Sequence, residues 1–209
     1  MTAASAIEKE CLLGKDSNHQ NNLKMIISIS GTPGSGKSTV AKKLAEKLGY
    51  PRYYMGGLRR EKAKEKGLTL EEYNKLGEKD FATDREVDEF MKELGKKEDN
   101  FIIEGRTAFH FIPHSYKIFL DVDEKVGAER IFSHLQTDKS RNEGEGLNSI
   151  EDVLRANRER MKSDKKRYKK YYNLDVFDKN HYDLYLDTTE MSEEEEFKQV
   201  WLAIKKKMA

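Results

Sequence analysis

A glycine-rich stretch at residues 31–39 constrains this chain more than any other feature. Its letters, GTPGSGKST, match the phosphate-loop pattern G-x-x-x-x-G-K-[ST] at every fixed position. An apolar run at residues 25–30 precedes the stretch, and a helix-forming segment at residues 40–48 follows it. This order of strand, loop and helix lets backbone N–H groups and a helix N-terminus converge on one anion. The sequence therefore predicts a loop that binds the phosphates of a nucleotide.

The residue types in this loop suit that chemistry. Glycine at three positions allows backbone conformations that a Cβ atom would block, so that successive N–H groups face phosphate oxygens. Lys37 supplies a positive charge to the β- and γ-phosphates, and the Ser38 hydroxyl is placed to coordinate Mg²⁺. We expect the nucleotide to contact the whole loop, which consists of Gly31, Thr32, Pro33, Gly34, Ser35, Gly36, Lys37, Ser38 and Thr39.

Composition and charge exclude several classes of protein. The chain has 39 Lys and Arg residues against 38 Asp and Glu, and the formal net charge of +1 provides no overall field for nucleic acid or an anionic membrane. Its one cysteine, Cys11, can form no internal disulfide, which is typical of reducing compartments. No apolar run approaches the roughly 20 residues of a membrane span, and no signal peptide is evident. We therefore expect a cytoplasmic protein without a nucleic-acid or membrane partner.

Strand-like and helix-like patterns alternate through residues 25–209, whereas residues 1–24 are polar and show no apolar period. We interpret residues 1–24 as an N-terminal extension. The alternation predicts an α/β fold of the P-loop NTPase type, in which helices cover both faces of a five-stranded parallel sheet and the ligand binds at the carboxyl ends of the strands. The expected strands are residues 25–30, 52–55, 101–104, 116–122 and 183–187.

Helical segments interrupt the alternation after the second strand and predict an inserted lobe at about residues 57–97. Capping-box spacing of Thr69 with Glu72 and of Thr83 with Glu86 indicates where two of its helices begin. The expected helices of the lobe are residues 58–66, 69–76 and 83–94.

A second insertion, at residues 136–148, is polar and has no apolar period. The spacing of Ser149 and Asp152 predicts the start of a long helix that reaches about residue 172. Ser192 is the expected cap of a final helix, which should dock on the sheet through one apolar stripe. That stripe consists of Phe197, Val200, Trp201 and Ile204.

Arginine residues help to choose among the switches, motors and kinases that use phosphate loops. No N-K-x-D motif follows a strand, which disfavours a GTPase. Phosphoryl transfer is catalysed mainly by positioned cations, so arginines that converge on one cleft favour a kinase. Arg60 and Arg106 are the strongest candidates because each follows a predicted strand, although any single arginine also fits a solvated surface. The further candidates are Arg130, Arg141, Arg160 and Arg167.

The region after the second strand indicates the kind of acceptor. A hydroxyl acceptor benefits from a nearby carboxylate base, whereas a nucleotide phosphate, with a second pKa of about 6, is already mostly ionised at neutral pH. The second strand leads to Gly56 and Gly57 with no carboxylate beside them. A phosphate acceptor that arginines bind therefore fits better than a hydroxyl acceptor.

With these features together, residues 24–192 resemble the cytidylate kinases, most closely the short type of archaea and some bacteria. The resemblance implies a monomeric enzyme that uses ATP and Mg²⁺ to phosphorylate CMP and dCMP. It also implies that residues 57–97 bind the nucleoside monophosphate and that residues 136–149 form a lid. The segments that carry the resemblance are residues 31–39, 66–74, 103–106, 128–131 and 160–175.

The resemblance also implies roles for single residues. Arg60 and Arg106 would grip the acceptor phosphate, and Glu104 would lie near Mg²⁺ together with Ser38. Arg130 and the lid residue Arg141 would reach the ATP phosphates. The positions that contact the cytidine nucleotide in the family correspond to Arg160, Asp164 and Arg167.

Three positions depart from the family pattern and leave alternatives open. Gly57 stands where related kinases usually have an acidic residue, Met55 where many have Ser or Thr, and His134 where some have a second lid arginine. AMP, UMP and dTMP remain alternative acceptors, and an ATP-binding regulatory module without turnover remains a different class. From the residues alone, Asp164 between two arginines also fits an ion-pair ladder on a solvated helix.

Overall fold

The computed structural model describes residues 25–137 and 147–208 of the 209-residue chain. The predicted N-terminal extension, Arg141 and most of the predicted lid lie outside the described residues. Within the two described ranges, no helix is both long enough and apolar enough to cross a membrane.

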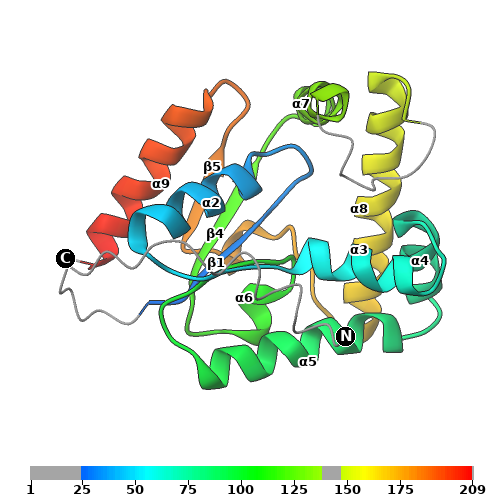
Figure 1. The fold of residues 1–209 in the computed structure, drawn as a ribbon, viewed down its shortest axis with the longest axis horizontal. Helices are drawn as coiled ribbons and strands as arrows, with labels where there is room; N and C mark the ends of the chain where they lie inside the picture. The colour runs from blue at the N-terminus through cyan, green and yellow to red at the C-terminus, as the bar shows by residue number, and fades with distance from the viewer. Residues whose placement is uncertain (1–24, 138–146, 209) are drawn as a thin grey trace.

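Five parallel strands form the sheet at the centre of the fold (Figure 1). They are β1 (Ile27–Gly31), β2 (Arg52–Tyr54), β3 (Ile102–Glu104), β4 (Tyr116–Asp121) and β5 (Leu184–Asp187), in the order β2-β3-β1-β4-β5. The central strand β1 is buried along its whole length because helices cover both faces of the sheet. The predicted α/β fold with a five-stranded parallel sheet is confirmed, with small shifts at the strand ends.

One face of the sheet is covered by two neighbouring helices (Figure 1), α2 (Lys37–Leu48) and α9 (Glu193–Met208). Val200 and Ile204 of α9 are fully buried in one cluster with residues of α2, β1 and β4. Phe197 and Trp201 pack partly buried against the same cluster. Their spacing places these side chains on one face of the helix, so the predicted docking of the last helix on the sheet is confirmed.

The predicted lobe contains three helices, α3 (Met55–Glu65), α4 (Leu70–Gly77) and α5 (Ala82–Lys97). A capping box starts α4 as predicted, because the Thr69 hydroxyl accepts from Glu72 N while the Glu72 carboxylate accepts from Thr69 N. The capping box predicted at Thr83 is wrong. The helix α5 begins at Ala82, and the buried Thr83 hydroxyl donates instead to Asp80 O at 3.1 Å.

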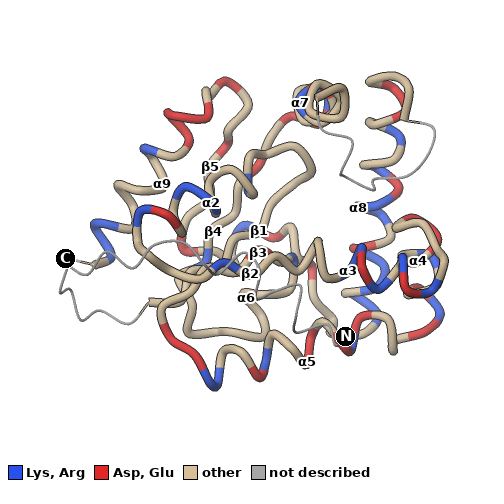
Figure 2. Tube along the Cα trace, in the orientation of Figure 1, with Lys and Arg blue, Asp and Glu red and all other residues tan. Residues whose placement is uncertain are grey.

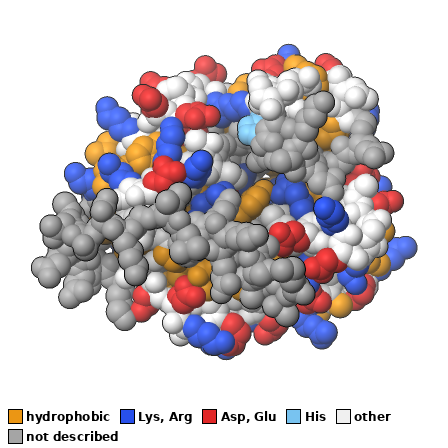
Figure 3. All heavy atoms as spheres, viewed as in Figure 1, with side chains coloured by type: hydrophobic (Ala, Val, Ile, Leu, Met, Phe, Trp, Pro, Cys, Tyr) orange, Lys and Arg blue, Asp and Glu red, His pale blue; other side chains and the backbone are white. Residues whose placement is uncertain are grey.

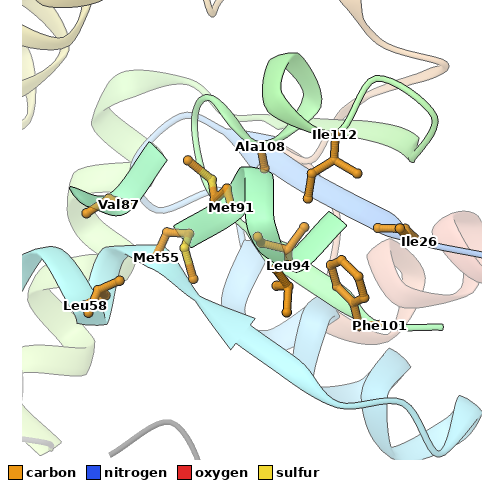
Figure 4. Packing of buried hydrophobic residues seen from close by; sticks show 10 residues of the cluster. Ile26, Met55, Leu58, Val87, Met91, Leu94, Phe101, Ala108 and Ile112 are labelled. Carbon is orange, nitrogen blue, oxygen red and sulfur yellow. The ribbon is translucent and has the colours of Figure 1, made fainter. Parts of the chain in front are cut away.

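A buried apolar cluster joins the lobe to the second face of the sheet (Figure 4). Side chains of α3 and α5 converge there with Phe101 and with the short helix α6 (Ala108–Phe111). Met55, which the sequence pattern assigned to the end of a strand, begins α3 and packs in this cluster. The sequence pattern missed α6, because one helical turn is too short to show a period.

Two longer helices lie on either side of the predicted lid segment, α7 (Glu124–Thr137) and α8 (Ile150–Tyr172). Ser149 caps α8 as predicted, because its hydroxyl accepts a hydrogen bond from Asp152 N at 3.1 Å. The helix α8 contacts both α7 and α4 (Figure 1). It therefore links the lobe to the part of the fold that carries the phosphate loop.

Replacement of Ile102 by alanine tests the core. Ile102 lies in β3 and is 0% exposed, so the substitution leaves a cavity and should lower the free energy of unfolding by about 2–5 kcal/mol. Leu202→Ala is the control, because Leu202 on α9 is 50% exposed and its loss should cost less than about 0.5 kcal/mol. Chemical denaturation measures both values, and similar losses in the two variants would contradict this assignment of the core.

Candidate active site

The glycine-rich loop connects the carboxyl end of β1 to the N-terminus of α2. Gly31, Gly34 and Gly36 have φ angles of 150°, 79° and 82°, a region that residues with side chains rarely adopt. A Cβ atom at Gly31 would collide with the carbonyl of Leu120, and one at Gly34 would collide with the backbone of Gly127. The predicted need for glycine is confirmed, and close packing against β4 and α7 adds to the conformational reason.

Side chains hold this loop in shape. The Lys37 ammonium donates to Thr32 O at 2.5 Å and to Ser35 Oγ at 3.3 Å, so it lies over the loop. The Thr32 hydroxyl donates to Asp121 Oδ1 at 2.9 Å and accepts from Val122 N at 3.0 Å, which fastens the loop to the end of β4. The loop is therefore a preformed cradle for an anion, with the N-terminus of α2 at its base.

Ser38 and Glu104 bring oxygen atoms together beside the loop. Ser38 Oγ donates to Glu104 Oε2 at 2.8 Å, and Arg52 Nε pairs with Glu104 Oε1 at 2.6 Å. Glu104 ends β3, the neighbour of β1, and its side chain is buried. Hydroxyl and carboxylate oxygens are ligands that Mg²⁺ takes together with phosphate and water. These residues therefore fit a magnesium site.

A cavity of about 800 Å³ opens beside the loop, within the size range of small-molecule sites. Figure 3 shows a hollow in the middle of this face with Lys and Arg side chains in its walls, and Figure 2 shows Lys and Arg on α3 and α8, which border it. Within the described ranges, the arginines that line the cavity come from four separate segments of the chain. They are Arg60, Arg106, Arg130 and Arg160.

Arg106 lies between the phosphate loop and α8. Its Nη1 donates to Gly31 O at 3.0 Å, and its Nε pairs with Asp164. The guanidinium lies over the ring of Phe177, 5.3 Å from the ring centroid. Contacts on three sides therefore fix the orientation of this cation at the edge of the cavity.

A row of alternating buried charges continues from Arg106 into the lobe. Asp164 pairs with Arg167, Arg167 with Asp84, and Asp84 with Arg59 Nη1 at 2.8 Å. Arg167 is 0% exposed and Asp164 is 3% exposed, so the solvated ion-pair ladder is wrong. Burial raises the pKa of Asp164, but the charges of Arg106 and Arg167 outweigh burial and hold that pKa below its ordinary value.

The predicted substrate residues thus occupy different places. Arg60 and Arg160 line the cavity. Asp164 and Arg167 do not line it, but the ion pair of Asp164 with Arg106 connects them to its edge. Arg130 lines the cavity while its Nη2 donates to backbone carbonyls after β5, including Thr188 O at 2.8 Å. Its predicted contact with ATP phosphates, like that of Arg141 outside the described residues, stays a prediction.

Four residues that shape the site were missed by sequence reasoning. Arg52 orients Glu104, while Arg59 and Asp84 belong to the buried row of charges. The fourth is Glu196, which is buried against the cavity. A signal existed for Glu196, because it lies four residues before Val200 in the apolar stripe of α9.

Comparison with known proteins identifies the family. Residues 26–190 match the family model described as the cytidylate kinase-like family. The cytidylate kinase of Methanocella arvoryzae is 39% identical over 165 residues, which cover 79% of this chain and 88% of that protein. The cytidylate kinase of Pyrococcus horikoshii is 38% identical over 182 residues, which cover 87% of this chain and 88% of that protein. Shikimate kinase from Bacteroides thetaiotaomicron shares the fold, with a TM-score of 0.58 at 15% identity over 88% of this chain and 99% of that chain.

Asp84→Ala tests the buried row of charges. The substitution leaves the buried guanidinium groups of Arg59 and Arg167 without a shared partner, so we expect the free energy of unfolding to fall by about 3–5 kcal/mol. Glu71→Ala is the control, because it removes an exposed ion pair with Lys75 and should cost no more than about 1 kcal/mol. Urea denaturation distinguishes the two, and equal costs would show that the row adds no more than a surface pair.

Asp88 makes stability depend on pH. It accepts hydrogen bonds from Thr107 and Tyr172, yet burial raises its pKa from 3.8 to about 6. The carboxyl group of Asp88 therefore binds its proton more tightly in the folded chain than in the unfolded chain. The stabilisation that this proton on Asp88 gives the folded state is fully present below pH 4 and is lost as the pH rises from about 4 through 6.

Asp88→Asn removes this titration. Between pH 4 and 7 the variant should gain on the order of 2–3 kcal/mol in unfolding free energy relative to the wild type. Denaturation curves across that range measure the difference, with the exposed neighbour change Glu89→Gln as control. A constant difference between Asp88→Asn and the wild type would mean that Asp88 does not titrate there.

Proposed function

The chain belongs to the cytidylate kinase-like family, and we propose that it transfers the γ-phosphoryl group of ATP to CMP, which yields ADP and CDP. The observation that carries this proposal is the cavity in which the phosphate loop and four arginine side chains meet. Positioned cations are the main requirement of phosphoryl transfer. We extend the proposal to dCMP as a second acceptor, to Mg²⁺ as the companion of ATP, and to a monomer in the cytoplasm.

The donor phosphates would bind in the phosphate loop. Backbone N–H groups of residues 31–39 and the N-terminus of α2 supply directed partial charges, and Lys37 adds a full charge that can turn toward the β- and γ-phosphates. Ser38 and Glu104 are the residues that would hold Mg²⁺. When bound, this ion neutralises charge on the phosphate oxygens.

The acceptor phosphate would bind opposite the loop. Arg60 and Arg160 line the cavity from the lobe and from α8, and Arg106 donates to Gly31 O at the start of the loop. A nucleotide phosphate has a second pKa of about 6, so it attacks as the dianion at neutral pH and needs no general base. The work of the protein is then to align two anions and to exclude water.

Asp164 and Arg167 would act on the acceptor in two ways. Their row of ion pairs keeps the Arg106 guanidinium aimed at the cavity, which is a positioning role. Direct contact with the cytidine nucleotide, as the family resemblance implies, is also part of the proposal and requires the nucleotide to enter between the lobe and α8.

Activity assays with separate acceptors test the proposed function. ADP formation from Mg·ATP should be fast with CMP or dCMP and much slower with UMP, AMP, GMP or dTMP. A preference for UMP, AMP, GMP or dTMP would support a nucleoside monophosphate kinase but contradict CMP as its acceptor. Slow hydrolysis that no monophosphate accelerates would instead support a regulatory ATP-binding module.

Arg106→Ala tests the role of the arginines. Loss of a cation aligned on the transferring group should lower kcat at least about 100-fold. Arg106→Lys keeps the charge but loses the fork of donors to Gly31 O and Asp164, so it should recover only part of the rate. Arg155→Ala is the matched control, because Arg155 is exposed on α8 and pairs only locally with Asp152. An Arg106→Ala enzyme with the control's rate would remove Arg106 from the mechanism.

A further inference from the structure

Glu196 lies on the buried face of α9, where the other buried side chains are apolar. It precedes Val200 and Ile204 at four-residue intervals on the buried face of α9, and the three are the buried residues of that helix. Its side chain is 2% exposed. A carboxylate in such a position is costly unless a partner satisfies it, so the acid needs an explanation other than packing.

The surroundings of Glu196 leave one of its oxygens unsatisfied. The carboxylate packs so closely on Gly36 that a Cβ atom there would collide with it. Among the described residues, no group makes a hydrogen bond to the buried Oε1 atom. Burial raises the pKa of Glu196 to about 7, although the charges of Arg130 and Lys37 act in the opposite direction.

The charged neighbours do not supply the missing hydrogen bond. Arg130 directs Nη2 to backbone carbonyls of Thr188 and Met191 at 2.8 and 3.1 Å. The Lys37 ammonium is bonded to Thr32 O and Ser35 Oγ within the phosphate loop. Glu193 and Lys43 also act on the charge of Glu196, and they pair with each other at 3.8 Å.

The position of Glu196 along the cavity assigns it to the donor nucleotide. Arg60 and Arg160 line the cavity from α3 and α8, whereas Glu196 lines it from α9, and Arg130 of α7 donates to Met191 O just before α9. The phosphate loop, between β1 and α2, has α9 on one side and α3 and α8 on the other (Figure 1). With the acceptor on the side of Arg60 and Arg160, a nucleotide whose phosphates lie in the loop extends its nucleoside toward α7 and α9.

We propose that Glu196 accepts a hydrogen bond from the nucleoside part of the phosphoryl donor, either from an exocyclic amino group of the base or from a ribose hydroxyl. This inference rests on the proposed function for the identity of the donor. A donor nucleotide that offers such a group satisfies the unpaired Oε1 atom. One that lacks it leaves a buried carboxylate oxygen unpaired, so the site rejects it by at least about tenfold.

Donor analogues combined with Glu196 variants test this role. ATP is compared with purine riboside triphosphate, which lacks the 6-amino group, and with 2′-dATP and 3′-dATP, which each lack one ribose hydroxyl. The wild type should use at least one analogue about tenfold less well than ATP in kcat/KM, through the KM for the donor. The deficient analogue identifies the group that Glu196 binds. Glu196→Val should use all four donors alike, whereas Glu196→Gln, which keeps an acceptor oxygen, should retain part of the preference.

Two controls separate this inference from folding and from the proposed function. Glu194→Gln removes the same charge from an exposed residue of the same helical turn, and it should keep the wild-type order of donors. Thermal unfolding should show Glu196→Val at least as stable as the wild type at pH 8, because an apolar side chain suits the stripe. Calorimetric binding of the four donors needs no turnover, so it tests Glu196 even if CMP is not the acceptor. An identical order of donors in Glu196→Val and the wild type would overturn the proposal.

Discussion

The pairing of Arg106 with Asp164 connects the phosphate loop to the lobe that borders the cavity. Through it runs the row Arg106, Asp164, Arg167, Asp84 and Arg59, which crosses from the end of β3 through α8 into α5 and α3. Buried ions are tolerated only when their partners are in place. The row holds three arginines against two aspartates and ends on an arginine at each side, Arg106 at the cavity and Arg59 within the lobe.

The phosphate loop and the arginines that line the cavity are held in place in different ways. The phosphate loop is rigid because Gly31 and Gly34 pack directly against the backbones of β4 and α7. The arginines instead reach the cavity on long side chains from separate elements. Glu196 is a buried acid beside Gly36 of the loop, and burial raises its pKa. The cavity therefore combines a loop held by backbone packing, long arginine side chains and a buried acid.

Much of this arrangement could be predicted from local patterns. The phosphate loop and the caps at Thr69 and Ser149 depend on residues within one turn of each other, and the structure confirms them. Arg106 was predicted as a residue of the ligand cleft because it follows a strand, and the carboxyl ends of parallel strands meet at one edge. The cap at Thr83 failed because α5 begins at Ala82, so Thr83 lies inside the first turn and its hydroxyl donates to Asp80 O. Neither Arg59 nor the buried state of Arg167 was predicted, since their partners come from distant segments.

The chain's order of residues was therefore enough to establish the loop, the sheet and the candidate arginines near strand ends, because each depends on neighbours in sequence or on strand polarity. Folding in three dimensions decided which charges became buried pairs and which remained in the cavity. Asp164 looks the same in sequence whether it faces solvent or Arg106, and Glu196 looks like one of four consecutive acids. Burial and the choice of ion partner depend on which helices pack together, and the spacing of residues within one helix does not determine that packing.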